Sequence, residues 1–492
     1  MGVIRIQKEG DPHHCIGPFV LREKDHCDNL LVFMRIKQKT DFRKPQSHPA
    51  RAIIFSFMGA ILVGWILLSL PQASNGPPLS LVDSLFTATS ATCVTGLIVV
   101  DTGARFTTFG QVVILALIQL GGLGIMTFSA LFLIFMGGRF SLKHRLMMQE
   151  SFSQYPMKGI FHLVRLVVSF TLLIEFLGAL FLYGKFVRFF PPLQASYYAV
   201  FHSISAFCNA GFSLYETSFF AFQNDLQVNI VITTLIIIGG IGFFVLADLN
   251  LMERIVRLRK PRLSLHTKTV FVVTGVLILL GTVLVLTLEW HNTLSGKPLG
   301  VKLLAAYFQS VTARTAGFNT LFTGQLTNAT LFVLILLMFV GASPGSTGGG
   351  IKTSTFGILI ALLVSRIRGR QNVELFGRTV PLSIVAKAVS VVSLALFIVI
   401  VFTLALSVAE GGLVSPHLKR GQFLEFLFEI TSAFGTVGLS TGVTSTLSSL
   451  GKILVTITIF IGRLGPLSLA LAVGQRVIRR GYEYPEENIM VG

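Results

Sequence analysis

The amino-acid sequence predicts an all-α membrane protein with four tandem span, pore-helix, span repeats, and so eight transmembrane helices, around one central pore. Three observations predict this fold. The 492 residues are 52% hydrophobic and only 13% charged, with a mean hydropathy of +0.75, which is more apolar than soluble domains. Eight apolar stretches are long enough to be spans, and a short signature recurs four times.

The apolar stretches justify the spans. They lie at roughly residues 52–70, 111–136, 160–184, 226–247, 269–288, 326–364 with an interruption, 382–408 and 450–475. At about 1.5 Å of rise per residue, each can cross a hydrocarbon core of about 30 Å. The internal period predicts repeats at 51–137, 138–252, 253–368 and 369–480, with a basic cytoplasmic extension at 1–50 and a cytoplasmic tail at 481–492.

The basic residues behind the net charge of +18 predict the orientation in the membrane. They are concentrated in alternate connections, at residues 5–51, 139–145, 254–268, 366–378 and 476–480. Basic flanks resist translocation, so these connections and both termini are expected to be cytoplasmic, in a multi-pass protein of the cell membrane. This distribution argues against nucleic acid as a partner, and the polar first 50 residues show no apolar core of a signal peptide.

The recurring signature falls in the other connections, which face outward. Its copies are Phe86, Ser90, Ala91, Gly96 and Leu97; Phe201, Ser205, Ala206, Gly211 and Phe212; Phe308, Thr312, Ala313, Gly317 and Phe318; and Phe428, Ser432, Ala433, Gly438 and Leu439. Amphipathic segments at 80–91, 195–206, 301–313 and 422–433 lead into the copies. They are too short to cross a membrane, so we expect re-entrant pore helices, the first starting at Ser80 and Asp83 in capping-box spacing.

The backbone before each signature glycine is predicted to bind a cation. Irregular chain at membrane depth is tolerated only where it faces protein or lines a hydrated cavity. The side chains differ between the copies, so the shared ligands are carbonyl oxygens, and glycine permits the backbone angles that they need. The predicted filter residues are Thr92, Cys93, Val94, Thr95, Gly96, Cys208, Asn209, Ala210, Gly211, Arg314, Thr315, Ala316, Gly317, Gly435, Thr436, Val437 and Gly438.

Five segments resemble the Trk/Ktr/HKT superfamily of potassium transporters, and most closely its Ktr-type membrane subunit. They are SATCVTGL at 90–97, SAFCNAGF at 205–212, TARTAGF at 312–318, SAFGTVGLSTG at 432–442 and GASPGSTGGGIKTST at 341–355. The resemblance covers roughly residues 50–480. Trk-type members have two further spans before the first repeat, for which this sequence has no room, so the resemblance favours the Ktr type.

The resemblance implies potassium uptake as the function. Potassium-selective members have glycine at the filter position of all four repeats, as here. Members assemble with a cytosolic nucleotide-binding ring, usually as dimers. We therefore expect a homodimer in membrane lipid with such a ring as a regulatory partner. The partner rather than this chain would bind the regulatory nucleotide, and potassium is the only ligand expected, without a covalent cofactor.

The sixth apolar stretch is interrupted by ten residues that contain one proline and five glycines, which exclude a regular helix. A P-loop would need Lys directly after the second of its two glycines, but Ile351 separates Gly350 from Lys352. We expect an intramembrane loop, and the resemblance implies that it acts as a gate. The predicted gate residues are Gly341, Ser343, Pro344, Gly345, Ser346, Thr347, Gly348, Gly349, Gly350, Lys352 and Arg463.

Two charged residues lie in the middle of apolar stretches, where an unpaired charge is costly. Arg463 is about thirteen residues into the last stretch, about 20 Å from its start by helical rise. The resemblance implies that it lies beside the gate loop and limits cation leak. Glu175 either pairs with a basic group or sits in an interface, and the sequence does not choose.

Other functions stay open as alternatives. A sodium-selective or sodium-coupled monovalent cation transporter would have the same fold. A membrane enzyme or a scaffold is more remote, because the spans contain no converging paired carboxylates, His clusters or nucleophile motif. Cys15 and Cys27 near His13, His14 and His26 raise a metal site, but their spacing matches no established ligand pattern, so no metal beyond potassium is expected.

Overall fold

The structure is a computed structural model that describes residues 49–123, 160–249, 263–411 and 421–465. The N-terminal extension with Cys15 and Cys27, the basic connections at 139–145 and 476–480 and the C-terminal tail lie outside the described residues. All the described residues belong to one compact unit.

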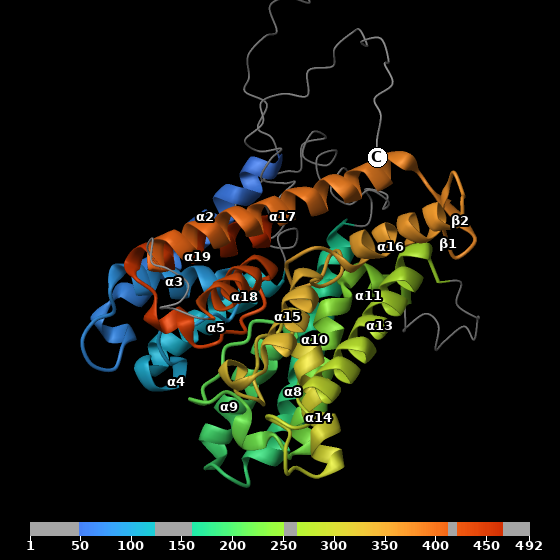
Figure 1. The fold of residues 1–492 in the computed structure, drawn as a ribbon. Helices are drawn as coiled ribbons and strands as arrows, with labels where there is room; N and C mark the ends of the chain where they lie inside the picture. Colours follow the sequence, from blue (N-terminus) through green and yellow to red (C-terminus); the bar gives the residue numbers. More distant parts are fainter. Residues whose placement is uncertain (1–48, 124–159, 250–262, 412–420, 466–492) are drawn as a thin grey trace, which may run out of the picture. The chain divides into compact units, whose positions relative to one another are not determined.

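Helices make up almost all of the described secondary structure (Figure 1). The first predicted repeat contains α2 (Pro49–Ser69), η1 (Pro71–Ala73), α3 (Leu81–Thr92), α4 (Thr102–Arg105) and α5 (Thr108–Gly122). The second contains α8 (Ile160–Phe186), α9 (Pro192–Phe207), η3 (Phe220–Phe222), α10 (Leu226–Ile241) and α11 (Phe243–Leu249). The third contains α13 (Leu265–Leu288), α14 (Leu299–Thr312), η4 (Thr323–Gln325), α15 (Asn328–Phe339) and α16 (Thr353–Ile367). The fourth contains β1 (Val373–Leu375), β2 (Arg378–Val380), α17 (Leu382–Gly411), α18 (Gln422–Gly435), η5 (Val443–Thr446) and α19 (Ser449–Leu464).

The strands β1 and β2 correct the all-α expectation. They pair antiparallel, with Val373 opposite Val380, in and just after the basic connection at 366–378. The two residues between them, Phe376 and Gly377, have φ of 47° and 73°. Positive φ at both loop positions is the requirement of a tight type I′ hairpin. The fold is therefore helical with one short hairpin.

Three continuous helices in the described ranges are long and apolar enough to cross a membrane, namely α8, α13 and α17. The pair α10 and α11 adds a fourth if it forms one span. Three of the other predicted spans are represented by shorter apolar helices: residues 54–69 of α2, then α5, and then the pair α15 and α16. The last predicted span contains α19. Many large hydrophobic side chains on α8, α13 and α17 are exposed, including Phe176, Leu279 and Phe397. Such exposed apolar faces suit contact with lipid.

The predicted span at 226–247 is wrong as an uninterrupted helix, because α10 and α11 meet at an angle of 91°. Gly242 lies at the bend with a φ of 99°. A Cβ atom there would lie only 2.6 Å from the Pro344 carbonyl oxygen, and the Phe243 N–H donates to the Gly345 carbonyl at 2.9 Å. The loop at 341–350 therefore approaches the chain so closely at this bend that the position needs glycine.

The four short helices α3, α9, α14 and α18 match the expected amphipathic segments. The Ser80 hydroxyl accepts the Asp83 N–H at 3.0 Å, which confirms the expected start of α3. The signature phenylalanines of all four helices are at most 1% exposed. Each short helix also contacts a helix of the preceding predicted repeat, and the series closes on itself. The pairs are α5 with α9, α10 with α14, α15 with α18, and α19 with α3 (Figure 1).

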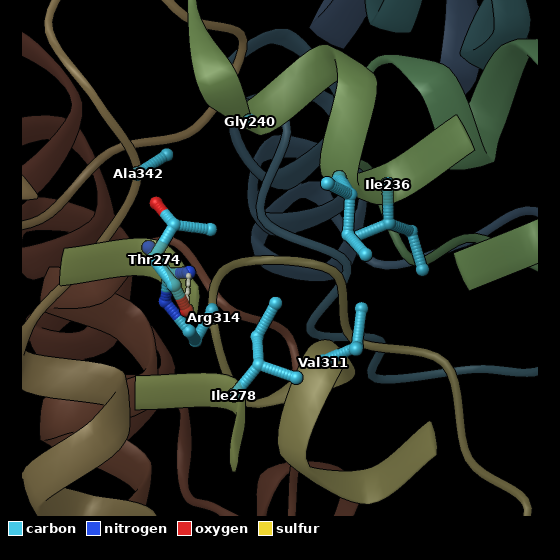
Figure 2. Close-up of a pocket in the computed structure, with 8 residues that line it drawn as sticks. Ile236, Gly240, Thr274, Ile278, Val311, Arg314 and Ala342 are labelled. Atoms are coloured by element: carbon cyan, nitrogen blue, oxygen red, sulfur yellow. Dashed lines mark hydrogen bonds between the residues drawn. The ribbon is translucent and has the colours of Figure 1, made fainter. Parts of the chain in front are cut away.

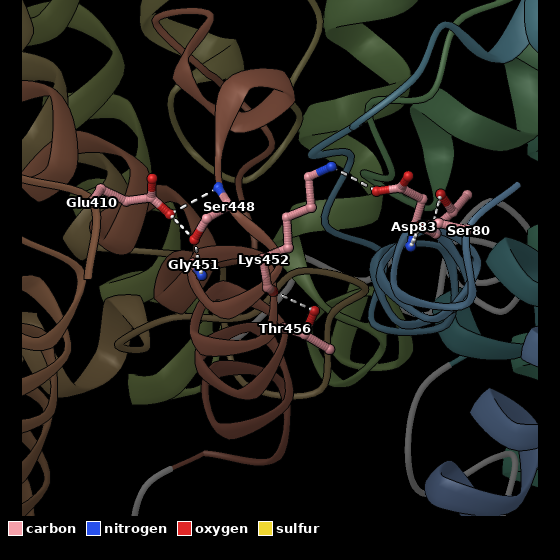
Figure 3. A network of polar contacts seen from close by, with 8 residues as sticks. Ser80, Asp83, Glu410, Ser448, Gly451, Lys452 and Thr456 are labelled. Atoms are coloured by element: carbon pink, nitrogen blue, oxygen red, sulfur yellow. Dashed lines mark hydrogen bonds and ion pairs between the residues drawn. The ribbon is translucent and has the colours of Figure 1, made fainter.

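A clasp joins two helices in each predicted repeat. In each case the N-cap residue of a later helix bonds to a residue near the end of an earlier one. The helix pairs are α5 with α2, α10 with α8, α15 with α13, and α19 with α17. Three clasps are Thr107 Oγ1 to the Gln72 carbonyl at 2.7 Å, Asp225 to Lys185 at 2.5 Å, and the Thr327 N–H to Glu289 at 2.9 Å. In the fourth, the Ser448 N–H donates to Glu410 at 2.9 Å (Figure 3). Each short helix lies in the chain between the two clasped ends.

Candidate functional site

The four signature glycines form a closed ring of backbone contacts. All four have positive φ, with values of 86°, 70°, 78° and 91° in chain order. A Cβ atom on any of them would collide with the carbonyl oxygen that precedes the next glycine. The hypothetical contacts are Gly96 to Ala210 O at 2.4 Å, Gly211 to Ala316 O at 2.7 Å, Gly317 to Val437 O at 2.6 Å, and Gly438 to Thr95 O at 2.2 Å. Only glycine fits this close approach at this φ.

The segments before these glycines share a backbone conformation although their side chains differ. The residue two positions before each glycine has a positive φ, which is rare outside glycine. These residues are Val94 at 55°, Asn209 at 59°, Thr315 at 76° and Thr436 at 50°. Such strained backbone persists only where the surroundings hold it in place. The recurrence therefore lies in the backbone, as the unlike side chains suggested.

The signature Ser or Thr holds each segment against its helix. Its backbone carbonyl accepts the N–H of the residue before the glycine, at 2.8 to 2.9 Å in all four copies. In three copies its hydroxyl donates to the carbonyl of the residue after the glycine: Ser90 to Leu97 at 2.8 Å, Ser205 to Phe212 at 2.7 Å and Thr312 to Phe318 at 2.7 Å. In the fourth copy the Ser432 hydroxyl accepts the Gly438 N–H at 3.1 Å. These hydroxyls recur in the sequence signature, but the pattern alone predicts no role for them.

The third copy is one residue shorter than the others, and the turn after its helix absorbs the difference. The Ala316 N–H reaches the carbonyl of Thr312, four residues earlier, whereas the Thr95 N–H reaches Ser90, five residues earlier. The Thr312 hydroxyl still bonds to the residue after the glycine. The glycine therefore keeps its place in the ring.

Two of the predicted filter residues are helical. Thr92 is the last residue of α3, and its hydroxyl donates to the Ala88 carbonyl at 2.8 Å. Gly435 is the last residue of α18. All four short helices end at these segments, so their carbonyl termini, which carry partial negative charge, adjoin the glycine ring.

The predicted gate residues 341–350 form a loop with a closed neck between α15 and α16. Val340 and Ile351 form a parallel bridge, and the Ala342 N–H donates to the Gly349 carbonyl at 3.3 Å. A Cβ atom on Gly341 would lie 2.2 Å from the same carbonyl oxygen. Helix α15, rather than a strand, precedes this loop, which excludes the P-loop alternative.

This loop lies directly against the third and fourth glycine segments. The Gly349 N–H donates to the Thr436 hydroxyl at 2.9 Å. A Cβ atom on Gly348 would lie 2.2 Å from the Thr315 hydroxyl. The Asn209 amide is 3.2 Å from that same hydroxyl, so the second segment adjoins the group as well. Thr315 and Thr436, each two residues before its glycine, thus form the surface on which the loop rests.

The rest of the loop packs on α9 to α11. The Ser343 N–H donates to the Gly240 carbonyl at 3.0 Å, and the Ser343 hydroxyl lies 2.8 Å from that of Thr353. The Thr347 N–H donates to Gly239 at 3.3 Å, and its hydroxyl to Phe207 at 3.4 Å. Ser346 is buried without a partner for its hydroxyl, and Gly345 and Gly350 have φ of 69° and 66°. The carbonyls of Pro344 and Gly345 contact the bend at Gly242.

The cationic side chains of Arg463 and Lys352, both predicted gate residues, bind carbonyls of the loop. Arg463, which is 6% exposed, donates through one nitrogen to the Thr347 carbonyl and through the other to the Gly121 carbonyl of α5. The Lys352 Nζ donates to the Gly348 carbonyl at 2.8 Å. Carbonyl acceptors offset part of the cost of burying a charge. Arg463 therefore links the loop to a helix of the first predicted repeat.

Glu175, which the sequence left open, contacts the second glycine segment. Its carboxylate accepts Gln119 Nε2 at 3.2 Å and the Cys208 thiol at 3.7 Å. None of the ion pairs in the described part of the chain includes it. Glu175 therefore sits in an interface between α5, α8 and the residue that follows α9.

A family model described as "Cation transport protein", TrkH, matches residues 38–477 of the chain. The match covers both the glycine segments and the loop at 341–350. The chain belongs to the TrkH family. This match confirms the family that the sequence motifs resemble.

Relatives in this family match over nearly their whole length. Ktr system potassium uptake protein B of Bacillus subtilis is 40% identical over 446 residues, which are 90% of this chain and 97% of that protein. Potassium/sodium uptake protein NtpJ of Enterococcus hirae is 35% identical over 449 residues, again 90% and 97%. The crystal structure of the potassium transporter TrkH from Vibrio parahaemolyticus matches with a TM-score of 0.66 and 17% identity, over 91% of this chain and 90% of that one.

These matches and the apolar helices identify a multi-pass membrane protein of a transporter family. The relatives bear the names of uptake and transport proteins, so the expectation that the chain is not an enzyme is confirmed. The described residues of this TrkH-family chain contain no group of three or more His, Cys, Asp or Glu that could hold a metal ion.

Proposed function

We propose that this chain is a potassium uptake subunit whose four repeats surround one central pore. The closed ring of four glycine segments carries the proposal. Four copies of one backbone conformation meet in chain order, and rings of backbone carbonyls replace the hydration shell of a permeating cation. The series of helix contacts that returns from α19 to α3 also supports four repeats around one axis, with boundaries at 51–137, 138–252, 253–368 and 369–480.

Potassium is the proposed ion because all four ring positions are glycine, which is the pattern of the potassium-selective members that the sequence resembles. The names of the relatives agree, since one is a potassium uptake protein and the other a potassium/sodium uptake protein. The second name keeps a sodium-selective or sodium-coupled transporter as the competing function. Potassium flux with and without a sodium gradient distinguishes the two.

The test of the filter is Gly317→Ser in proteoliposomes. A side chain at Gly317 would meet both a φ of 78° and the Val437 carbonyl at 2.6 Å, so serine must displace a carbonyl of the ring. We expect the ratio of potassium to sodium uptake to fall about tenfold or more, since a misplaced ligand costs on the order of a hydrogen bond to a charged group.

The matched control is Gly296→Ser. Gly296 has a φ of 72° but no neighbour within 4 Å of a Cβ atom, so this variant carries the same backbone strain away from the ring. Unchanged relative uptake in a folded Gly317→Ser protein would contradict the filter assignment. Equal loss in both variants would point to general strain instead.

The loop at 341–350 with Lys352 and Arg463 is the proposed gate below this filter. Its support is position, because the loop rests on Thr315 and Thr436 and is tied to α5 through Arg463. By resemblance, the proposal also includes a homodimer in membrane lipid, cytoplasmic termini, and a cytosolic nucleotide-binding ring as a partner. Copurification of this chain with such a ring, and its mass in detergent, test those parts.

A further inference from the structure

Arg314 is the only charged residue at its position in the four glycine segments. The residues three positions before the glycines are Cys93, Cys208, Arg314 and Gly435. Arg314 is 7% exposed, and it takes part in none of the ion pairs within the described ranges. A buried cation without a carboxylate is costly unless polar groups surround it. The acceptors that it does use therefore indicate its role.

The two terminal nitrogens of Arg314 reach two different elements. Nη1 donates to the Thr274 carbonyl of α13 at 3.5 Å (Figure 2). Nη2 donates to the Gly341 carbonyl at 3.4 Å. Both distances are at the long end for hydrogen bonds. The guanidinium thus bridges a continuous spanning helix and the first residue of the loop.

A small cavity adjoins this bridge. It has a volume of about 20 Å³ and is lined by Ile236, Gly240, Thr274, Ile278, Arg314 and Ala342, among others (Figure 2). Arg314 Nε and the Thr274 hydroxyl are buried without a partner in the protein. A cavity needs about 10 to 15 Å³ to hold a water molecule, so this cavity has room for one water molecule.

Gly341 is the point where Arg314 holds the loop, and it lies in the closed neck. Thr315, which follows Arg314 in the chain, contacts Gly348 on the other side of that neck. Arg463 and Lys352 bind farther along, at the carbonyls of Thr347 and Gly348. The third glycine segment thus contacts both sides of the neck through two consecutive residues.

We infer that Arg314 is a positioning residue that fixes the neck of the loop to the third glycine segment and to α13. Because one backbone carries both Arg314 and Gly317, a shift of the neck displaces the ring, and a change in the ring shifts the loop. Gate position and ion selectivity are therefore coupled through this side chain. The inference rests on the proposed transport function and adds to it the route by which the two parts communicate.

The test compares Arg314→Gln, Arg314→Lys and Thr274→Val in proteoliposomes. Gln removes the charge and one of the two donor arms, whereas Lys keeps the charge but cannot bridge two acceptors from a planar fork. Thr274→Val removes only the unpaired hydroxyl in the same cavity and leaves both carbonyl acceptors, so it is the matched control. Basal rubidium flux, the potassium to sodium ratio, and the labelling rate of a Ser346→Cys reporter in the loop are measured for each.

We expect Arg314→Gln to raise basal flux and reporter labelling and to lower the selectivity ratio, each by about tenfold, the size of effect that loss of a charged hydrogen bond produces. Arg314→Lys should show smaller changes in the same three readouts, and Thr274→Val none. If Arg314→Gln does not fold, the Lys variant carries the test.

Wild-type behaviour of both Arg314 variants, or a change in only one of selectivity and loop labelling, would overturn the inference. So would equal changes in Thr274→Val. Failure of the proposed function is a separate result, since the unmodified protein would then move no potassium at all.

Discussion

Lys452 Nζ of α19 lies 2.7 Å from Asp83 Oδ1 of α3, so an ion pair joins the last predicted repeat to the first (Figure 3). The two side chains are 16% and 19% exposed. Asp83 also sits in the first turn of α3, where a negative charge is favoured by the helix dipole. This pair closes the series of helix contacts at the one place where the chain does not continue from one repeat to the next.

Replacing Lys452 with Met should destabilise the protein by about 1 to 3 kcal/mol, because it leaves a partly buried carboxylate without its cation. Thermal unfolding in detergent measures the change. Arg370→Met is the control, since its pair with Glu374 is 49% and 42% exposed and exposed pairs contribute about 0 to 1 kcal/mol. A double-mutant cycle with Asp83→Asn isolates the pair, and a coupling energy near zero would refute its role in closing the ring.

The hydroxyl of Thr312 should be required for the third glycine segment to keep its shape. It donates to the buried Phe318 carbonyl at 2.7 Å, and loss of such a bond leaves an acceptor unpaired at a cost of about 1 to 3 kcal/mol. Thr312→Val, which keeps the shape of the side chain, should therefore lower potassium over sodium selectivity, whereas Thr312→Ser should retain it. Competition of sodium with rubidium uptake measures the ratio. Selectivity that survives in the Val variant would show that packing alone holds the segment.

Arg463 should restrain the loop at 341–350. Replacing it with Ala removes the bonds to the Thr347 and Gly121 carbonyls and a positive charge beside the proposed path. We expect basal rubidium flux to rise by about tenfold or more, because charge-assisted bonds to buried acceptors are strong. Lys352→Met, which removes a single bond to Gly348, should have a smaller effect. A fall in flux in a folded Arg463→Ala protein would assign this side chain a positioning role instead.

The features that the sequence predicted correctly depend on local chemistry. Ser80 caps α3 because hydroxyl and N–H are three residues apart, and the glycines at 341–350 end α15 wherever that helix lies in space. The bend at Gly242 was not predicted, because it depends on contact with Pro344 and Gly345, about a hundred residues later in the chain. Long-range contacts of this kind leave no periodic signal in the sequence.

The same distinction applies to the candidate site. The signature identified the four glycines, but the ring that they form depends on contacts among all four segments. No sequence pattern marks the Gly121 carbonyl as the acceptor for Arg463. The hydroxyls of Ser90 and Ser205 were visible as recurring letters, and a search for side-chain donors near each glycine could have assigned their role. The hairpin at 373–380 had no such signal, because Phe376 with its φ of 47° stands where a two-residue turn favours Asn, Asp or Gly.

Glu289, just beyond the end of α13, should make stability depend on pH. Burial alone would raise the pKa of its carboxyl, but hydrogen bonds from Thr330, Thr327, Thr293 and Asn292 outweigh burial and hold the pKa below its ordinary value of 4.5. A carboxyl whose pKa is lowered in the folded state stabilises the protein above its unfolded pKa, and this stabilisation is lost as the pH falls through the folded pKa.

Unfolding temperatures of the wild type in detergent should therefore fall as the pH drops below 4.5, and the fall should be shallower in Glu289→Gln. At neutral pH this variant should be less stable by about 1 to 3 kcal/mol, since the clasp to Thr327 loses its charged acceptor. Glu410→Gln is the control, because Glu410 forms the matching clasp to Ser448 in the fourth predicted repeat. Parallel loss of stability in Glu289→Gln and the wild type below pH 4.5 would contradict this prediction. Other carboxylates, and not the clasp at Glu289, would then be the acid-sensitive groups.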